Sequence, residues 1–180
     1  MREYSTVISG FGGQGVILAG KILARTGMER GLEVTWLPSY GPEMRGGTAN
    51  CTAIISSKLI GSPIVDSPSA LIAMNPPSLD KFETRVQENG LIVVNSSLVD
   101  EPKGRDNIKV VNVPLNEIAK EIGNQKVINM VALGAWAKFV EEISLQDVIK
   151  GMEMTLTDMG KERFIGSNRE ALEKGFGHAE

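Results

Sequence analysis

The amino-acid sequence predicts one three-layer α/β/α domain over residues 1–180, with a mostly parallel, mixed sheet. Short apolar segments of strand character alternate with segments whose apolar residues follow helical spacing, which is the pattern of an α/β domain. A helix separates the first two expected strands and is long enough for a parallel crossover. Residues 58–61 are too few for a second crossover helix, so we expect the segment after them to pair antiparallel.

The expected order begins with a strand at residues 6–9, a helix at residues 16–28 and a second strand at residues 33–37, parallel to the first. The helix carries its apolar side chains on one face. Gly20 lies inside it, where glycine costs about 1 kcal/mol relative to alanine. We therefore expect Gly20 to pack closely on the sheet. This strand, glycine-rich turn, helix and strand form a Rossmann-like start.

The rest of the chain continues the alternation. Residues 62–68 predict a surface strand or turn, because their prolines lack the donor that a central strand needs. Ser144 with Asp147 predicts a helix start, residues 167–170 fit a capping box, and residues 177–180 predict a disordered tail. The further strands are expected at residues 48–57, 70–74, 91–95 and 108–113, and the further helices at residues 79–87, 115–122, 127–140, 145–156 and from the capping box to about residue 175.

The most hydrophobic expected helix, residues 127–140, holds Gly134 and Ala135 in its middle. Small residues at such a position let another backbone approach closely. Packing of the helix on its own sheet is one interpretation of this pattern. A contact with another subunit is the other.

Composition argues against several classes of function. The net charge is −3, with acidic and basic residues scattered along the chain. No stretch interleaves aromatic and basic residues in the way that base stacking uses, so we expect no nucleic-acid partner. No apolar run approaches the roughly 20 residues that cross a bilayer, so no membrane partner is expected. The first residues enter a strand without a signal-peptide pattern, and a single cysteine excludes an internal disulfide. We therefore expect a cytoplasmic protein.

The inventory of metal and redox ligands is small. Cys51 is the only cysteine, and an iron–sulfur cluster needs about four thiolates, so this chain alone holds no cluster. Cys51 lies in an apolar, strand-like segment and is interpreted as a buried structural thiol. His178 is the only histidine and lies in the expected tail, which argues against histidine catalysis and histidine metal sites.

A first glycine-rich loop, residues 10–15 (GFGGQG), joins the first strand to the first helix. Gly10, Gly12 and Gly15 match the G-x-G-x-x-G spacing of dinucleotide-binding turns. Backbone N–H groups and the positive end of the helix dipole converge there and attract an anion. The acid that binds ribose hydroxyls should end the second strand, but Glu33 lies at its start. A structural turn or another phosphate contact is therefore favoured over an NAD or FAD site.

A second loop, residues 39–47 (SYGPEMRGG), follows the second strand. In a parallel arrangement it opens beside the first loop, because ligands of open α/β sheets bind outside the carboxyl ends of the strands. Two interpretations stay open. The loop is a solvated turn shaped by Pro42, with Glu43 and Arg45 as surface charges, or it is a docking loop whose Arg45 meets a carboxylate or phosphate.

Together the two loops resemble the gamma subunit of 2-oxoacid:ferredoxin oxidoreductases, of the 2-oxoglutarate or 2-oxoisovalerate type. The resembling segments are residues 8–15 (ISGFGGQG), 39–47 and 129–134 (NMVALG), and the resemblance runs over nearly the whole chain. It implies an oxidoreductase of anaerobic metabolism that converts a 2-oxoacid, coenzyme A and oxidised ferredoxin to acyl-CoA, CO2 and reduced ferredoxin. The small subunit of indolepyruvate:ferredoxin oxidoreductase shares these loops and is the alternative within the family.

The resemblance implies that thiamine diphosphate, Mg and Fe–S clusters belong to partner subunits, one thiamine-binding and one ferredoxin-like, with ferredoxin as acceptor and coenzyme A as co-substrate. This chain would complete the active-site cleft, bind no cofactor and no metal alone, carry no catalytic residue, and be inactive and a homo-oligomer when isolated. The residues carried over to the cleft are Gly10, Gly12, Gly13, Gln14, Gly15, Tyr40, Gly41, Pro42, Glu43, Arg45, Gly46 and Gly47.

Within that expectation, Arg45 and the N–H groups of the first loop face an anion, either a phosphate of coenzyme A or a carboxylate of a neighbouring subunit. A hypothesis of a different class is a stand-alone nucleotide-binding module that uses residues 10–15.

Overall fold

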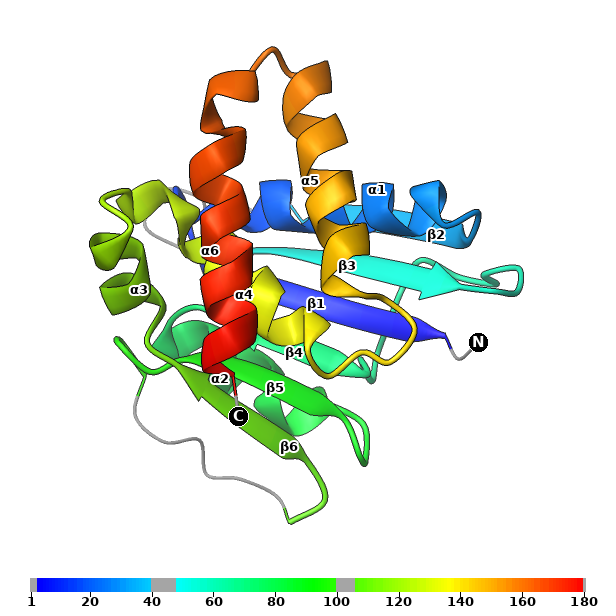
Figure 1. Cartoon of the computed structure of the whole chain (residues 1–180). Coiled ribbons are helices and arrows are strands. Elements are labelled where there is room, and N and C mark those ends of the chain that lie inside the picture. Colours follow the sequence, from blue (N-terminus) through cyan, green and yellow to red (C-terminus); the bar gives the residue numbers. More distant parts are fainter. Residues whose placement is uncertain (1–2, 40–47, 100–105, 180) are drawn as a thin grey trace.

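The computed structural model describes residues 3–39, 48–99 and 106–179. Within them the strands form one sheet of order β2-β3-β1-β4-β5-β6 (Figure 1). The strands are β1 (Tyr4–Phe11), β2 (Glu33–Ser39), β3 (Thr48–Ser56), β4 (Ala70–Ala73), β5 (Leu91–Asn95) and β6 (Lys109–Val113). The helices are α1 (Val16–Glu29), α2 (Pro76–Phe82), α3 (Leu115–Glu121), α4 (Ile128–Ala137), α5 (Leu145–Asp158) and α6 (Ile165–His178), with the 3-10 turns η2 (Glu83–Arg85), η3 (Gln125–Val127) and η4 (Glu162–Phe164).

The sheet is mixed, as predicted. β1, β4, β5 and β6 are parallel neighbours, whereas β3 lies antiparallel between β1 and β2. β1 and β2 therefore run in the same direction without touching. The prediction of antiparallel pairing after residues 58–61 is wrong. Because β3 already returns the chain to the edge where the parallel strands begin, a helix-free link is enough for β4 to join β1 in parallel.

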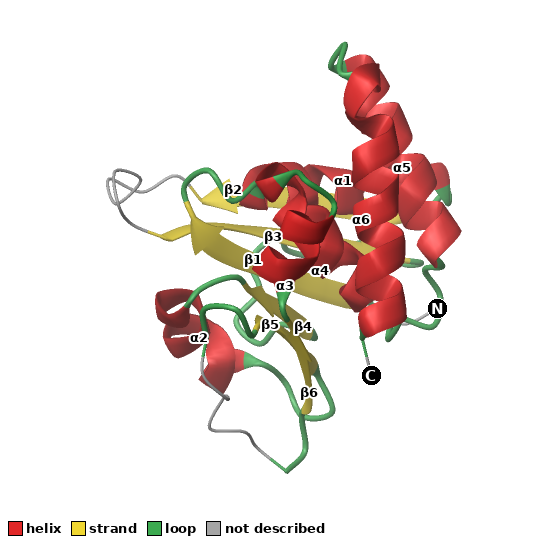
Figure 2. Ribbon diagram, turned by 60° about the vertical axis from the view of Figure 1, so that its left-hand side comes forward, coloured by secondary structure: helices red, strands yellow, loops and turns green. Residues whose placement is uncertain are grey.

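Helices cover both faces of the sheet, which gives the expected three layers (Figure 2). α1, α3, α4, α5 and α6 lie on one face and α2 on the other. Successive side chains of a strand point to opposite faces, so β1 places Ile8 in the larger core and Val7 in the smaller core under α2. Trp136 of α4 is fully buried, and its indole N–H donates to the hydroxyl of Thr6 over 3.1 Å.

Several helix ends differ from the prediction. α2 begins at Pro76 instead of residue 79, because the side chain of Asn75 accepts the backbone N–H of Ser78 over 2.9 Å and caps the helix. The helix start at Ser144 is confirmed, since its hydroxyl and the Asp147 carboxylate form a reciprocal capping box with the backbone.

The predictions for the last helix are wrong at both of its ends. The capping box at residues 167–170 does not form, because η4 leads directly into α6 and Ser167 lies inside its first turn, where its hydroxyl donates to the carbonyl of Phe164. The expected tail is also helical through His178. Ala179 is fully buried, and its carbonyl accepts the Lys138 ammonium.

Glycines set two close approaches between elements. A Cβ atom at Gly134 would overlap the carbonyl oxygen of Leu172 in α6, and one at Gly175 would overlap that of Val131 in α4. The small residues of α4 therefore serve a contact with another helix of the same chain. This differs from both sequence-based interpretations, because α4 meets α6 on the side away from the sheet.

Gly20 of α1 packs on the sheet as predicted, since a Cβ atom there would clash with the sulfur of Cys51. The prediction of a buried structural thiol is confirmed as well. Cys51 is fully buried, its sulfur donates to the Val16 carbonyl over 3.3 Å, and burial raises the pKa of the thiol to about 12.

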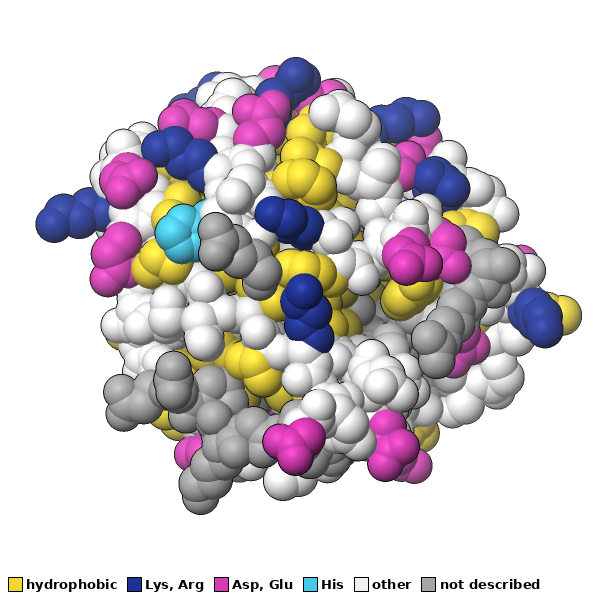
Figure 3. Space-filling model, turned by 60° about the horizontal axis from the view of Figure 1, so that its bottom comes forward, with side chains coloured by type: hydrophobic (Ala, Val, Ile, Leu, Met, Phe, Trp, Pro, Cys, Tyr) yellow, Lys and Arg dark blue, Asp and Glu magenta, His cyan; other side chains and the backbone are white. Residues whose placement is uncertain are grey.

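None of the described helices is both long enough and apolar enough to cross a membrane. On the face shown in Figure 3, acidic and basic side chains are interspersed with apolar ones. This mixed surface agrees with a net charge of −3.

Candidate functional site

The carboxyl ends of β1 and β4 lie side by side at the point where the chain leaves the sheet in two directions. After β1 the chain enters α1 on one face, and after β4 it enters α2 on the opposite face. In open α/β sheets this is a topological switch point, where ligands characteristically bind. The first glycine-rich loop and Asn75 flank this point.

The first loop is closed by one of its own side chains. β1 continues through Gly10 and Phe11, and the turn is made by Gly13 and Gly15, whose φ angles of 93° and 75° favour glycine. The backbone N–H of Phe11 donates to Oε1 of Gln14 over 2.6 Å, and the N–H of Gln14 donates to the Phe11 carbonyl over 3.2 Å. In a loop that binds phosphate, the N–H of Phe11 would point outward to the ligand. Here it is hydrogen-bonded within the loop.

Two asparagines hold this loop from opposite sides. Asn129 of α4 is buried under Gly15, where its Nδ2 donates to the Gly15 carbonyl over 3.1 Å and its Oδ1 accepts the N–H of Met130 over 3.0 Å. A Cβ atom on Gly15 would collide with the Asn129 amide. On the other side, Nδ2 of Asn75 approaches Oε1 of Gln14 at 3.4 Å. The loop geometry therefore depends on contacts from α4 and from the β4–α2 turn.

Buried hydroxyl and amide groups continue along this edge of the sheet. Ser9 of β1 donates to Ser78 over 2.9 Å. At the end of β5, Nδ2 of Asn95 donates to the Met74 carbonyl over 3.1 Å and to Oδ1 of Asn116 over 2.9 Å. These contacts satisfy polar groups that would otherwise be costly to bury.

One acidic side chain ends this series of polar groups. The Ser97 hydroxyl donates to the Glu117 carboxylate and holds its pKa below the usual value. The groups that flank the first loop itself, Gln14, Asn75 and Asn129, are neutral amides. A fixed positive charge at the loop would therefore have to come from the α1 dipole or from residues outside the described ranges.

The second loop lies outside the described residues, and with it the predicted site residues Tyr40, Gly41, Pro42, Glu43, Arg45, Gly46 and Gly47. Its two anchoring strands are described. Ser39 and Asn50 are paired between β2 and β3, and Asn50 is also paired with Ser9 of β1. Both ends of the second loop therefore leave the sheet at the edge that carries the first loop, as expected, although the intervening strand is antiparallel.

Sequence reasoning gave no role in the loop to the two asparagines that hold it, although Asn129 begins the resembling segment at residues 129–134. Asn75 has a recognisable signal, because asparagine directly before proline is a common start of a helix. Asn129 has no local signal, since its partner Gly15 lies 114 positions earlier in the chain. Among the described residues, no three acidic, histidine or cysteine side chains lie close enough together to hold a metal ion.

Comparison with known proteins identifies the family. Residues 5–177 match the family described as Pyruvate ferredoxin/flavodoxin oxidoreductase. The chain is 39% identical over 178 residues to ketoisovalerate oxidoreductase subunit VorA of Methanothermobacter marburgensis. This match covers 97% of the chain but only 36% of VorA, which is a longer protein. It is also 33% identical over 172 residues to 2-oxoglutarate synthase subunit KorC of Methanocaldococcus jannaschii. This match covers 94% of the chain and 90% of KorC.

A solved structure agrees with these relatives. The gamma subunit of a keto/oxoacid ferredoxin oxidoreductase from Geobacter sulfurreducens superimposes with a TM-score of 0.83 at 32% identity, over 97% of both chains. The chain therefore belongs to the pyruvate ferredoxin/flavodoxin oxidoreductase family, as the resemblance of its two glycine-rich loops predicted.

Proposed function

We propose that this chain is the gamma subunit of a multi-subunit 2-oxoacid:ferredoxin oxidoreductase. The observation that carries the proposal is the match to KorC, a protein named as a subunit, over 90% of that protein's length. The G. sulfurreducens protein, named as a gamma subunit, also matches over 97% of both chains. The complex would oxidise a 2-oxoacid with coenzyme A and oxidised ferredoxin, and it would release acyl-CoA, CO2 and reduced ferredoxin.

In this proposal the chain shapes the active-site cleft and leaves the redox chemistry to its partners. Thiamine diphosphate, Mg and Fe–S clusters would belong to a thiamine-binding subunit and a ferredoxin-like subunit. The only cysteine of this chain is buried and held protonated by its high pKa, which suits a structural role. A cytoplasmic location belongs to the same proposal.

The proposal is tested by affinity purification of the tagged chain from its native host under anaerobic conditions, followed by mass spectrometry. Recovery of a thiamine-binding subunit and a cysteine-rich ferredoxin-like subunit supports it. Assays of the recovered complex with 2-oxoglutarate, 2-oxoisovalerate and indolepyruvate then separate the gamma-subunit assignment from the indolepyruvate alternative. Recovery of the chain alone contradicts the proposal.

We also propose that Arg45 and the first loop face one anion, a phosphate of coenzyme A or a carboxylate of a neighbouring subunit. Two features support this: both loops leave the same edge of the sheet, and the described side chains at the first loop are neutral. Arg45→Ala should weaken coenzyme A affinity or assembly, whereas Lys58→Ala, which removes an exposed charge from the other end of β3, should not. Unchanged assembly, affinity and turnover in Arg45→Ala would refute this role.

A stand-alone nucleotide-binding module remains the alternative of a different class. The position of Glu33 disfavours it, because this acid lies at the start of β2 and not at the carboxyl end of the strand, where a dinucleotide site binds its ribose hydroxyls. Isothermal titration of the isolated chain with NADH, FAD and ATP separates the two hypotheses. Tight binding of any of these ligands would favour the module.

We propose that the isolated chain self-associates. The side chains of Leu37, Leu59 and Ile64 are 44%, 89% and 71% exposed, so apolar surface is available around β2 and the segment after β3. Light scattering at high protein concentration tests this, and a monodisperse monomer would contradict it.

A further inference from the structure

A hollow on the helical side of the sheet plays no part in the proposed function. Its volume is about 320 Å3, at the lower end of the ~300–1,000 Å3 typical of small-molecule sites. It lies where the first turn of α1, η3, the last turns of α5 and the first turns of α6 meet. Segments far apart in the sequence build it, so its lining is set by tertiary packing.

The floor and one wall of the hollow are apolar. Val127 and Leu156 are 1% and 2% exposed and form part of the main core. Leu18, in the first turn of α1, adds to this lining. Phe164 is 37% exposed and also lines the hollow. An apolar or aromatic group that entered the hollow would therefore gain contact with surfaces already held in place.

Two lysines stand at the rim of the same hollow. Lys126 is held at its backbone by the side chain of Asn124, which accepts its N–H over 3.1 Å. The N–H of Lys161 donates to the Leu156 carbonyl over 2.8 Å and closes the end of α5. The backbone of each lysine is thus fixed beside the hollow, while its side chain is exposed.

The charged residues that line the hollow are all positive. None of the described residues that line the hollow is acidic. Within the described ranges, neither Lys126 nor Lys161 takes part in an ion pair, in contrast to Lys150 and Lys174 on the same layer of helices. Arg163 adds a further positive charge nearby, with its guanidinium 4.7 Å from the centroid of the Phe164 ring.

We propose that this hollow binds a small amphipathic anion. The apolar or aryl body of the ligand would rest on Val127 and Leu156 against Phe164, and its carboxylate or phosphate would lie between Lys126 and Lys161. An inorganic anion would leave the apolar floor unused, and a neutral ligand would leave the lysines unused. The site goes beyond the proposed function, because it lies within this chain and needs no partner subunit.

The test is a titration of the full-length, 15N-labelled chain followed by NMR. The probes are 4-phenylbutyrate, phenyl phosphate, neutral 4-phenylbutanol and inorganic phosphate. We expect saturable shifts of the amides of Lys126, Val127, Lys161 and Phe164 with the first two probes. Affinity for 4-phenylbutanol and for inorganic phosphate should be at least fivefold weaker, and the tighter of the two organic anions identifies the preferred acid.

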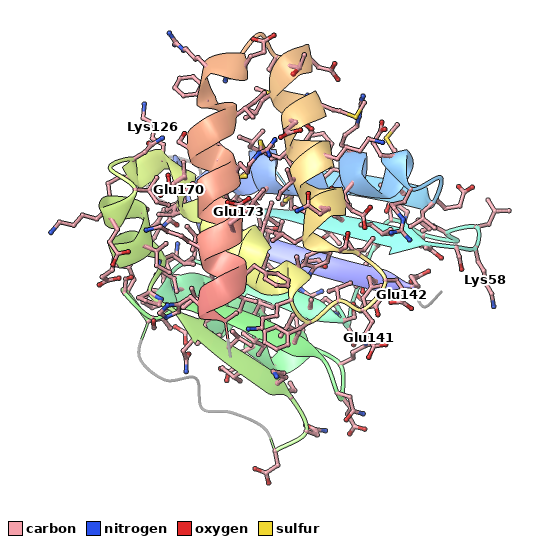
Figure 4. The ribbon with its side chains drawn as sticks, viewed as in Figure 1. Lys58, Lys126, Glu141, Glu142, Glu170 and Glu173 are labelled. Atoms are coloured by element: carbon pink, nitrogen blue, oxygen red, sulfur yellow. The ribbon has the colours of Figure 1, made fainter. Side chains whose placement is uncertain are left out.

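Variants show whether the lysines carry the binding. The double substitution Lys126→Ala, Lys161→Ala should weaken the two organic anions at least fivefold and leave the neutral probe unchanged. Lys58→Ala is the matched control, because Lys58 is an exposed lysine at the opposite side of the molecule (Figure 4) and should bind the probes as the parent chain does.

Three results would overturn the proposal: shifts centred on other elements, equal affinity for 4-phenylbutyrate and 4-phenylbutanol, or no effect of the double substitution in a chain whose spectrum stays dispersed. Because the titration uses the isolated chain, its outcome is independent of whether partner subunits are recovered by affinity purification.

Discussion

The α4–α6 interface and the first glycine-rich loop both depend on glycine, but for different physical reasons. At the interface, Gly134 and Gly175 have ordinary helical backbones, and the missing side chain lets each helix touch carbonyl oxygens of the other. In the loop, Gly13 and Gly15 adopt positive φ angles, and the missing Cβ removes a conformational penalty. Glycine is needed at the interface because two helices pack closely there, and in the loop because the backbone adopts a conformation that other residues disfavour.

The comparison explains why similar-looking glycines should differ in their tolerance of substitution. A glycine at a packed helix contact resists any added atom, since two rigid elements would have to separate. Where glycine only supplies a positive φ, its replacement lowers the stability by a limited, local amount. Gly15 belongs to both classes, because it has a positive φ and also touches Asn129.

The largest effect is expected at the helix contact. Gly134→Ala should lower the free energy of unfolding by about 3 kcal/mol, because the new methyl group overlaps the Leu172 carbonyl and overpacking of this kind outweighs the gain in helix propensity. Urea denaturation measures the change. Gly166→Ala is the matched control within α6, where a Cβ meets no atom within 4 Å, and it should be neutral or slightly stabilising. If the two variants are equally stable, the contact between α4 and α6 does not require glycine at position 134.

The next effect concerns the packed contact between α1 and the sheet, where Gly20 touches Cys51. Burial raises the pKa of this thiol from 9.0 to about 12, so above pH 9 the unfolded chain loses a proton that the folded chain keeps. Stability should therefore fall as pH rises, by about 1.4 kcal/mol per unit and about 2.7 kcal/mol at pH 11.

Urea denaturation at pH 8, 9, 10 and 11 measures this alkaline loss. Cys51→Ala removes the titrating group, so the variant should lose less stability than the parent chain over the same range. Parallel pH profiles of parent and variant would show that the thiol has the same pKa in the folded and the unfolded chain, and would contradict its burial.

A smaller effect is expected in the loop, where the two glycines sharpen the comparison. Gly15→Ala should cost about 2 kcal/mol, because it combines a positive φ with a collision against Asn129. Gly13→Ala should cost only about 1 kcal/mol, since its Cβ would meet open space. Thermal unfolding of both variants measures the difference. A larger loss for Gly13→Ala would mean that the loop is not held by Asn129.

The smallest effect is expected at the second support of the loop. Asn75→Ala removes the cap of α2 and the contact with Gln14, and it should cost about 1 kcal/mol. Hydrogen exchange should also become faster at the N–H of Phe11 if Gln14 is held by Asn75. Asn75→Asp is the comparison variant, because it keeps the capping oxygen but puts a buried carboxylate in place of the amide that donates to Gln14. If hydrogen exchange at the N–H of Phe11 is unchanged in both variants, Asn75 does not hold the loop.

Local signals predicted the elements well where the pattern was long or chemically marked. The strand at residues 91–95, the helix that starts at Val16 and the cap at Ser144 occur as predicted. Two of the failures share one cause. The helical end at His178 and the parallel pairing of β4 are decided by neighbours distant in sequence, which outweigh local propensity.

The order of amino acids was sufficient to predict an α/β chain with two glycine-rich loops and one cysteine, and those loops were enough to indicate its family. The tertiary structure alone decided which groups surround the first loop and which residues line the hollow between α1, η3, α5 and α6. The reason is physical. Strand and helix periodicity act over a few residues, whereas the contacts of Asn129 with Gly15 and of Gly134 with Leu172 exist only once separate elements have packed.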